Sequence, residues 1–186
     1  MKFGTFPTQF VTTRNLLIIT VIYMIFPLYL LPKSLHALQT VSGKPDILPL
    51  GMRPGFTPEI AWQTLETLGA SGRNVYLYSE LYMDSCYALV YGIFFSFLIV
   101  FLFKLAGGRL SRMTVVAWFP IAGTIADWIE NIGIVKMITM YPEQSNMWAR
   151  ITSVAGQAKW FFSGVGLLYI MVGLAVWAWK IIKTKP

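Results

Sequence analysis

Four long apolar segments limit the folds that this chain can adopt, because a helix needs about 20 apolar residues to cross a bilayer core of about 30 Å. The first segment contains an uncharged run from Leu16 to Leu31. Charged residues make up only 12% of the chain, whereas soluble domains contain about 25%. We therefore expect an all-α polytopic membrane protein, a single transmembrane domain over 1–186 with four antiparallel helices. The expected spans are 15–35, 75–103, 113–140 and 158–182.

Basic residues accumulate on one side of these four segments. No acidic residue lies before the first span, between the second and third, or after the fourth, where eight basic residues stand: Lys2, Arg14, Lys104, Arg109, Arg112, Lys180, Lys183 and Lys185. Lys and Arg are enriched in cytoplasmic loops, so we expect a bacterial inner-membrane protein with both termini in the cytoplasm. The net charge of +7 is spread between apolar segments and forms no polar face, which excludes nucleic acid as a partner.

The outer loop, 36–74, is expected to contain a short amphipathic helix. Thr57-Pro58-Glu59 combines a hydroxyl N-cap, a proline and an acid, a pattern typical of a helix start. Gly69 or Gly72 is expected to end this helix, whose apolar side would lie on the outer membrane interface. Within the first span, Pro27 is expected to kink or loosen the helix.

Ionisable residues inside membrane spans are costly, and their spacing in the second span predicts that they face other helices. Glu80, Asp84, Ala88, Gly92 and Ser96 recur every four residues and form one stripe. Small residues at this spacing let helix backbones approach closely. We therefore expect the two acids to point into the bundle and away from lipid.

The third and fourth spans carry the same kind of pattern. Asp127, Glu130 and Asn131 are related as i, i+3 and i+4, so they share one helix face. Lys159 begins a stripe of small residues on the fourth span and is the one clear basic partner of the four intramembrane acids. The charges are therefore expected to converge in the outer half of the bundle.

We expect these groups to surround an acidic cavity that opens outward. Carboxylates that lie close together in a low dielectric cannot all ionise, so such a site suits proton handling or a cationic ligand. The residues expected to bind a ligand or handle a proton are Asp127, Glu130, Asn131, Asp84, Glu80 and Lys159. The aromatic residues expected to line the cavity are Tyr82, Tyr87, Tyr91, Trp128 and Trp160.

Other site chemistries have little support in the sequence. A di-iron centre needs Glu-x-x-His on helices, but the only histidine is His36, at the end of the first span. The single cysteine, Cys86, excludes an internal disulfide and a thiolate metal cluster. No motif places a nucleophile beside His36 or forms a phosphate-binding glycine loop. No cofactor or metal ligand set is predicted, although the carboxylates are compatible with binding of a hard divalent cation.

A series of short motifs runs through the middle of the chain. They are Thr57-Pro58-Glu59-Ile60-Ala61-Trp62, Leu68-Gly69, Gly72-Arg73, Tyr76 to Asp84, Tyr91-Gly92, Asp127-Trp128-Ile129-Glu130-Asn131, Tyr141-Pro142 and Lys159-Trp160. Together they resemble a family of small, uncharacterised bacterial four-span membrane proteins, with Asp-x-x-Glu-Asn as the most specific element. The resemblance implies a common fold and no assigned activity. In size and intramembrane acids alone, the chain is also similar to the sterol isomerase and sigma-2 receptor group.

The sequence therefore predicts an integral membrane protein that binds a small molecule or cation in its acidic cavity. Asp127 and Glu130 would carry the charge or the proton, Lys159 would be the counter-ion and Asn131 would orient the ligand, and Asp127→Asn is expected to abolish ligand retention. A membrane enzyme acting by acid–base chemistry on a lipid or isoprenoid, and a structural or accessory subunit, remain open. The expected partners are the lipid bilayer, a small amphiphilic or cationic ligand, and a homo-oligomer or larger membrane complex.

Overall fold

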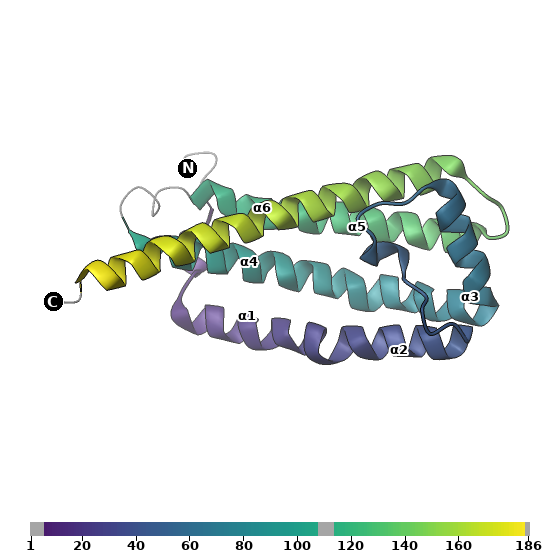
Figure 1. The fold of residues 1–186 in the computed structure, drawn as a ribbon, viewed down its shortest axis with the longest axis horizontal. Helices are drawn as coiled ribbons and strands as arrows, with labels where there is room; N and C mark the ends of the chain where they lie inside the picture. Colours follow the sequence, from purple (N-terminus) through teal and green to yellow (C-terminus); the bar gives the residue numbers. More distant parts are fainter. Residues whose placement is uncertain (1–5, 108–113, 185–186) are drawn as a thin grey trace.

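The computed structural model describes residues 6–107 and 114–184, and all regular structure within these ranges is helical. The long helices lie side by side along the longest axis of the molecule (Figure 1). The α-helices are α1 (Thr13–Ile25), α2 (Leu31–Ser42), α3 (Pro58–Tyr78), α4 (Ser85–Ala106), α5 (Trp118–Met140) and α6 (Asn146–Thr184). Two π-helical segments, η2 (Phe26–Leu30) and η4 (Ser79–Asp84), join α1 to α2 and α3 to α4, and short 3-10 turns occur at Thr8–Phe10, Leu50–Met52 (η3) and Thr114–Ala117.

Three helices in the described part of the chain are long and apolar enough to cross a membrane. They cover Thr13–Ser42, Pro58–Ala106 and Asn146–Lys183. α5 is not one of them, although the sequence predicted a third span at 113–140, because Asp127, Glu130 and Asn131 make it more polar. These three side chains are buried, so the polar face of α5 is covered by its neighbours, while its opposite, apolar face, with Ile125 and Ile132, is exposed.

The first long helix passes through Pro27 without breaking. Proline lacks the N–H needed for an α-helical bond, and the backbone around it widens into η2, which confirms the predicted loosening. The helix then continues to Ser42, beyond the expected end at about Leu35. Gly43 ends it with a left-handed φ of 64°, and the Gly43 N–H donates to the carbonyls of Gln39 and Thr40.

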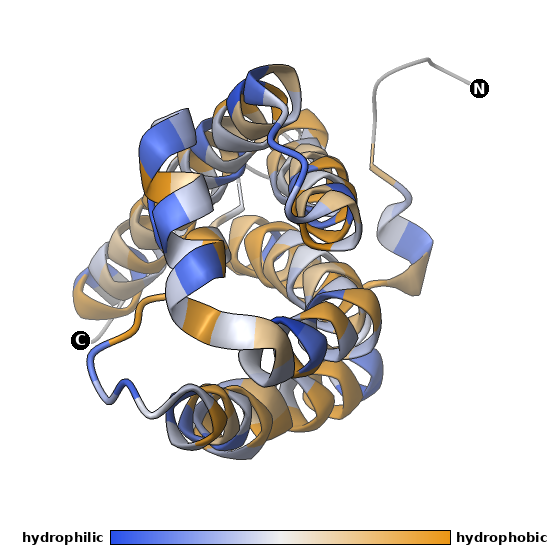
Figure 2. Cartoon of the chain, turned by 90° about the vertical axis from the view of Figure 1, so that its right-hand side faces the viewer, coloured by the Kyte–Doolittle hydropathy of each residue, from blue (hydrophilic) through white to orange (hydrophobic). Residues whose placement is uncertain are grey.

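α3 begins where the sequence predicted, but it does not end at Gly69 or Gly72 as expected: it bends at Gly69 and continues to Tyr78. The Thr57 hydroxyl accepts a hydrogen bond from the Ile60 N–H at 3.4 Å, and Gly69 breaks the helical path with φ 63° and ψ 179°. Before Gly69, the apolar side of the helix, with Trp62 and Leu65, is buried. Figure 2, which views the molecule from this end, shows α3 lying across the ends of the long helices, with hydrophilic residues along it.

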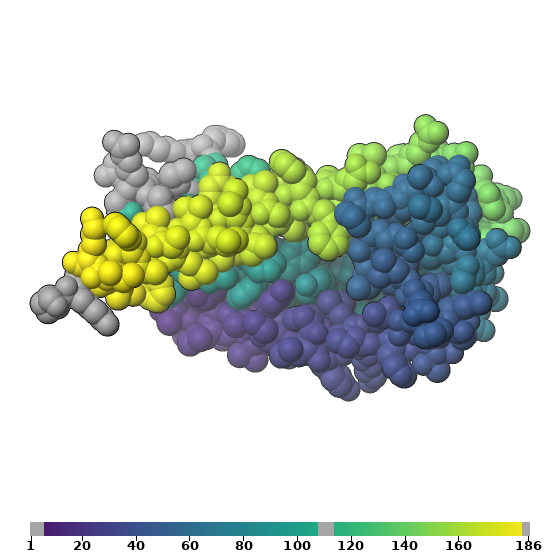
Figure 3. Space-filling view, viewed as in Figure 1, coloured from purple at the N-terminus to yellow at the C-terminus, as the bar shows by residue number. Residues whose placement is uncertain are grey.

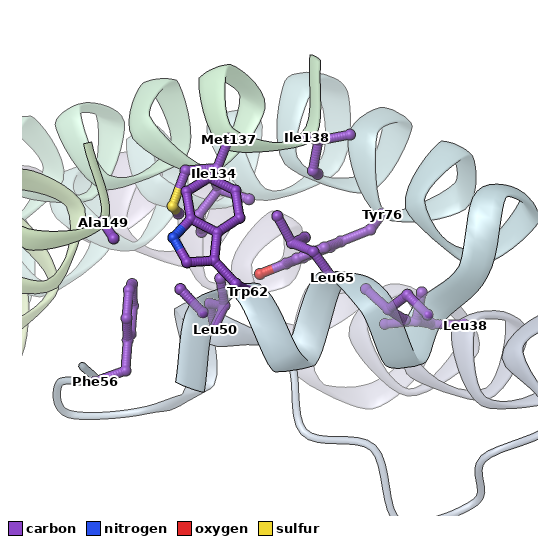
Figure 4. Packing of buried hydrophobic residues seen from close by; sticks show 12 residues of the cluster. Leu38, Leu50, Phe56, Trp62, Leu65, Tyr76, Ile134, Met137, Ile138 and Ala149 are labelled. Atoms are coloured by element: carbon purple, nitrogen blue, oxygen red, sulfur yellow. The ribbon is translucent and has the colours of Figure 1, made fainter. Parts of the chain in front are cut away.

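Two apolar clusters hold the bundle together, one at each end, and the polar residues lie between them along α5 and α6. The α3 cluster joins α3 to α5 and α6, and Figure 4 shows its side chains packed around Trp62. It contains Leu38, Leu50, Phe56, Ala61, Trp62, Leu65, Leu68, Tyr76, Ile134, Met137, Ile138 and Ala149. The α4 cluster contains Phe6, Val11, Ile99, Val100, Leu102, Phe103, Val116, Ala117 and Ile170.

Glycines allow α4, α5 and α6 to pack closely, and one of them, Gly92, belongs to the stripe of small residues that the sequence predicted. A Cβ atom on Gly92 of α4 would collide with the Thr124 hydroxyl of α5, and one on Gly133 of α5 would collide with Thr152 of α6. Ala88 and Ser96, which share the predicted stripe with Gly92, are completely buried. The stripe therefore does face the bundle interior.

α6 differs from its prediction in length. It begins at Asn146 instead of at about 158 and contains 39 residues, which at 1.5 Å per residue gives about 58 Å. The polar residues before 158, such as Arg150 and Gln157, extend the helix past the apolar segment. The basic residues Lys2, Arg109, Arg112 and Lys185, used above for orientation, and Met113, the expected start of the third span, lie outside the described residues.

Candidate functional site

Lys159 of α6 is the centre of a buried ion-pair cluster. Its ammonium group pairs with Glu130 Oε2 and, at 3.4 Å, with Asp127 Oδ1, both on α5. The Lys159 side chain is only 12% exposed, and those of the two acids are 3% exposed or less. The third contact of the ammonium group is the carbonyl of Gly51, at 2.8 Å. The spacing of Asp127 and Glu130 on one helix face, read from the sequence, is what brings both acids to Lys159.

Two further hydrogen bonds connect this cluster to α4 and η4. The Tyr91 hydroxyl donates to Asp127 Oδ2 at 3.1 Å, and the Asn131 side-chain amide donates to Asp84 Oδ2 at 3.0 Å. Asp84 and Asp127 thus accept hydrogen bonds and Glu130 pairs with Lys159 through Oε2. Glu80 Oε2 and Glu130 Oε1, by contrast, are buried with no hydrogen-bond partner among the described residues. Asn131 Oδ1 is buried and unpartnered in the same way.

A cavity of about 590 Å³ lies beside this cluster, within the range of about 300–1,000 Å³ typical of small-molecule sites. Of the residues predicted for a site, the structure places seven in its wall: Glu80, Asp84, Tyr87, Tyr91, Asp127, Lys159 and Trp160. Glu130 and Asn131 do not line this cavity. They lie behind it, where Glu130 holds Lys159 and Asn131 holds Asp84.

Tyr82 and Trp128 also lie outside the cavity wall. Tyr82 is 66% exposed and stacks on Tyr78 on the surface of the bundle. Trp128 is 38% exposed, and its indole N–H donates to the carbonyl of Ser85 at 3.0 Å. The structure thus puts these two aromatic residues on the outside of the helices that carry the acids.

The first long helix supplies a wall that sequence reasoning did not identify. Tyr23, Pro27, Leu31, Leu35 and Leu38 line the cavity from that side. The Tyr23 ring stacks on that of Tyr87 with centroids 6.2 Å apart. These residues carry no charge, and their only sequence signal was the i, i+4 spacing of an ordinary apolar helix face.

The segment Pro49–Met52 forms another unpredicted wall. The Gly51 N–H donates to the Tyr76 hydroxyl at 3.3 Å, while its carbonyl accepts from Lys159. Next to it, the carbonyl of Arg53 accepts from the Trp160 indole at 3.1 Å. Figure 3 shows this part of the chain, with α3, filling the face between α2 and α6 at one end of the molecule. Leu50, in the same segment, is fully buried, and no local sequence pattern predicted that this loop packs inward.

The described residues contain no group of three or more His, Cys, Asp or Glu side chains arranged to hold a metal ion. His36 is exposed at the end of the first long helix, and its Nδ1 contacts only the Thr40 hydroxyl, at 3.4 Å. The cluster around Lys159 therefore does not support the hard divalent cation that the carboxylates in the sequence allowed. The polar groups there are arranged to hold charge next to a mostly apolar space.

Comparisons with models of known protein families, with curated proteins and with solved structures found no match to this chain.

Proposed function

We propose that the protein binds a small amphiphilic cation, such as a hydrophobic amine, in the cavity of about 590 Å³. The observation that carries this proposal is the distribution of charge. Lys159 is already paired with Asp127 and Glu130, so it has no charge left for Glu80 and Asp84, which both line the cavity. A cationic group entering the cavity would meet two carboxylates that have no cationic partner in the described part of the chain.

The remaining walls favour the apolar part of such a ligand. Leu31, Leu35 and Leu38 of the first long helix form one side. Tyr23, Tyr87 and Tyr91 form a run of rings, with Tyr87 and Tyr91 edge to face at 5.3 Å. Aromatic faces attract cations by about 0.5–2 kcal/mol, so the rings support an organic ammonium better than a bare metal ion.

The proposal includes a membrane topology. The chain crosses the bacterial inner membrane four times in antiparallel fashion, with α5 added to the three strongly apolar helices as a span and both termini in the cytoplasm. Three apolar helices support this arrangement, as do Arg14, Lys104 and Lys183, which lie at one end of the bundle. The cavity then lies in the outer half of the membrane, where an amphiphile can enter from the outer leaflet.

The position of Glu130 favours binding over catalysis. The alternative, acid–base chemistry on a lipid or isoprenoid, requires both Asp127 and Glu130 to act on the substrate. Glu130 is completely buried, pairs with Lys159 and does not line the cavity. Its role in the proposal is to hold Lys159, and turnover is not part of the proposed function.

The test compares three probes of equal chain length in lipid nanodiscs: decyltrimethylammonium, decanol and decanoate. We expect saturable binding of the ammonium probe, at least tenfold tighter than of the other two. Glu80→Gln and Asp84→Asn should each weaken it about tenfold, equivalent to about 1.4 kcal/mol. Glu143→Gln, in the exposed α5–α6 connection, is the matched control. Equal binding of all three probes, or unchanged binding by both cavity variants, would refute the proposal.

A further inference from the structure

A second, smaller cavity of about 110 Å³ lies on the other side of Glu80, between η4 and α5. Its polar lining consists of Glu80, Ser85, Asn131 and Lys136. Glu80 is the one acid that lines both cavities. The Glu80 carboxylate therefore stands between two spaces with mostly apolar walls, and the small one contains only a few polar groups.

Two oxygen atoms at this small cavity lack a donor. The Asn131 amide nitrogen is used by Asp84, which leaves Asn131 Oδ1 as an acceptor with no partner. Glu80 Oε2 is in the same state. The two residues are 3% and 4% exposed, so bulk water does not solvate them. Buried acceptors in native proteins have a donor, a water or an ion, and two acceptors at one cavity require the occupant to be positive or to donate.

The local charge also points to a cation. Lys159 carries one positive charge and pairs with both Asp127 and Glu130. The negative charges of Glu80 and Asp84 are therefore in excess among the described residues. One ammonium ligand in the large cavity balances only part of this excess. Lys136 lines the small cavity but is exposed, so its charge is largely solvated. A second positive charge beside Glu80 would offset more of this excess.

We propose that the small cavity binds a monovalent hard cation such as Na⁺, held by Glu80 Oε2, Asn131 Oδ1 and water. The space suffices for an ion with a few waters, since each water occupies about 30 Å³. Divalent cations favour several carboxylates, whereas Glu80 is the only acid lining this space. The evidence for the ion site is these oxygen atoms and does not depend on amine binding. The coupling between the ion and the amine does rest on the proposed function, because both ligands would use Glu80.

This shared carboxylate makes the two ligands interdependent. If both bind to Glu80, each changes the affinity of the other by the same factor, as thermodynamic linkage requires. Both are positive and contact one carboxylate, so the amine and Na⁺ weaken one another. We expect the dissociation constant of the amine to rise at least threefold between a sodium-free buffer and saturating Na⁺.

The experiment begins without any amine. Binding of ²²Na⁺ to the purified protein in nanodiscs is measured, and melting temperatures are compared in chloride salts of Na⁺ and N-methylglucamine at equal ionic strength. We expect saturable ²²Na⁺ binding and a melting temperature that rises with Na⁺. Glu80→Gln and Asn131→Leu should lose both effects, and Glu143→Gln should keep them. Wild-type protein without ²²Na⁺ binding, or one that responds only to Mg²⁺ or Ca²⁺, overturns the assignment, whatever the variants do.

The amine titration then separates this inference from the proposed function. Decyltrimethylammonium binding is measured in N-methylglucamine buffer and again with Na⁺. Amine binding without ²²Na⁺ binding refutes the ion site alone. Binding of ²²Na⁺ without amine binding refutes the proposed function and leaves the ion site in place. Binding of both with no mutual effect refutes the sharing of Glu80.

Discussion

At the scale of single residues, Lys159 is the group on which the polar cluster depends. We predict that Lys159→Met lowers the stability of the protein by about 3–5 kcal/mol, the usual cost of removing one partner of a buried pair. The reason is that Glu130 and Asp127 would lose their cation in a buried site. Unfolding in detergent, followed by circular dichroism, measures the change.

A second variant distinguishes lost charge pairing from lost packing. In Lys159→Met with Glu130→Gln, the uncompensated charge of Glu130 is removed, so we expect part of the stability to return. Lys183→Met serves as the control, because Lys183 is exposed near the end of α6, where its ammonium group lies over the ring of Trp179. No recovery in the double variant would show that the aliphatic stem of Lys159, and not its charge, stabilises the site.

Helix periodicity was enough to predict which acids and which lysine face the interior, because i, i+3 and i+4 positions share a face. It did not predict which of these side chains bond to one another. The bond from Asn131 to Asp84, and the lack of a partner for Glu80 Oε2 among the described residues, depend on the rotation of η4 against α5, and sequence spacing does not give this rotation. Tyr82 was grouped with Tyr87 and Tyr91 by nearness in sequence, but it lies within the π-helical turn and faces outward.

At the scale of helices, the closest contacts of α5 with α6 depend on glycine. We predict that Gly133→Ala destabilises the protein by about 1–3 kcal/mol, as overpacking does, because the new methyl group would collide with Thr152. Gly164→Ala is the matched control on α6, since nothing lies within 4 Å of its added Cβ. Melting temperatures of the two variants, measured side by side, test the prediction; equal values would contradict it.

The bend in α3 offers a different test, because the cause there is conformational and not steric. Gly69 has φ 63° and ψ 179° with open space around it, a backbone region nearly restricted to glycine. We predict that Gly69→Ala costs about 1–3 kcal/mol and increases hydrogen exchange in Pro58–Leu68. Ser71→Ala, at an exposed position just after the bend, should change neither quantity. Unchanged exchange in Gly69→Ala would mean that the bend is not needed.

The helix boundaries were predictable where a cap or a glycine sets them, and not where a helix continues through polar residues. The start of α3 after the Thr57 cap followed from local chemistry, and so did an interruption at Gly69, although the sequence predicted an end there and the helix only bends. The first residues of α6 and the last residues of α2 did not, because hydropathy falls at the membrane surface although the helix goes on. The inward packing of Gly51 is a tertiary contact and has no local signal.

At the scale of the whole molecule, the proposed topology places the two ends of α5 on opposite sides of the membrane. In a Cys86→Ser background, we predict that a membrane-impermeant maleimide added to spheroplasts labels Glu143→Cys. It should not label Lys104→Cys or Lys183→Cys until the membrane is permeabilised, because these positions lie at the other end of the bundle (Figure 1). Labelling of all three positions from outside would contradict a fourth span.

The polarity of α5 has a consequence for how the chain is made. An aspartate at the centre of an inserting helix costs about 2.5–3.5 kcal/mol, and α5 carries Asp127 and Glu130 while lying outside the set of strongly apolar helices. The cation that neutralises them, Lys159, is on α6 and leaves the ribosome later. In the proposed membrane topology, α5 therefore has to wait at the translocon until α6 is synthesised, and the two helices enter the lipid together as a hairpin.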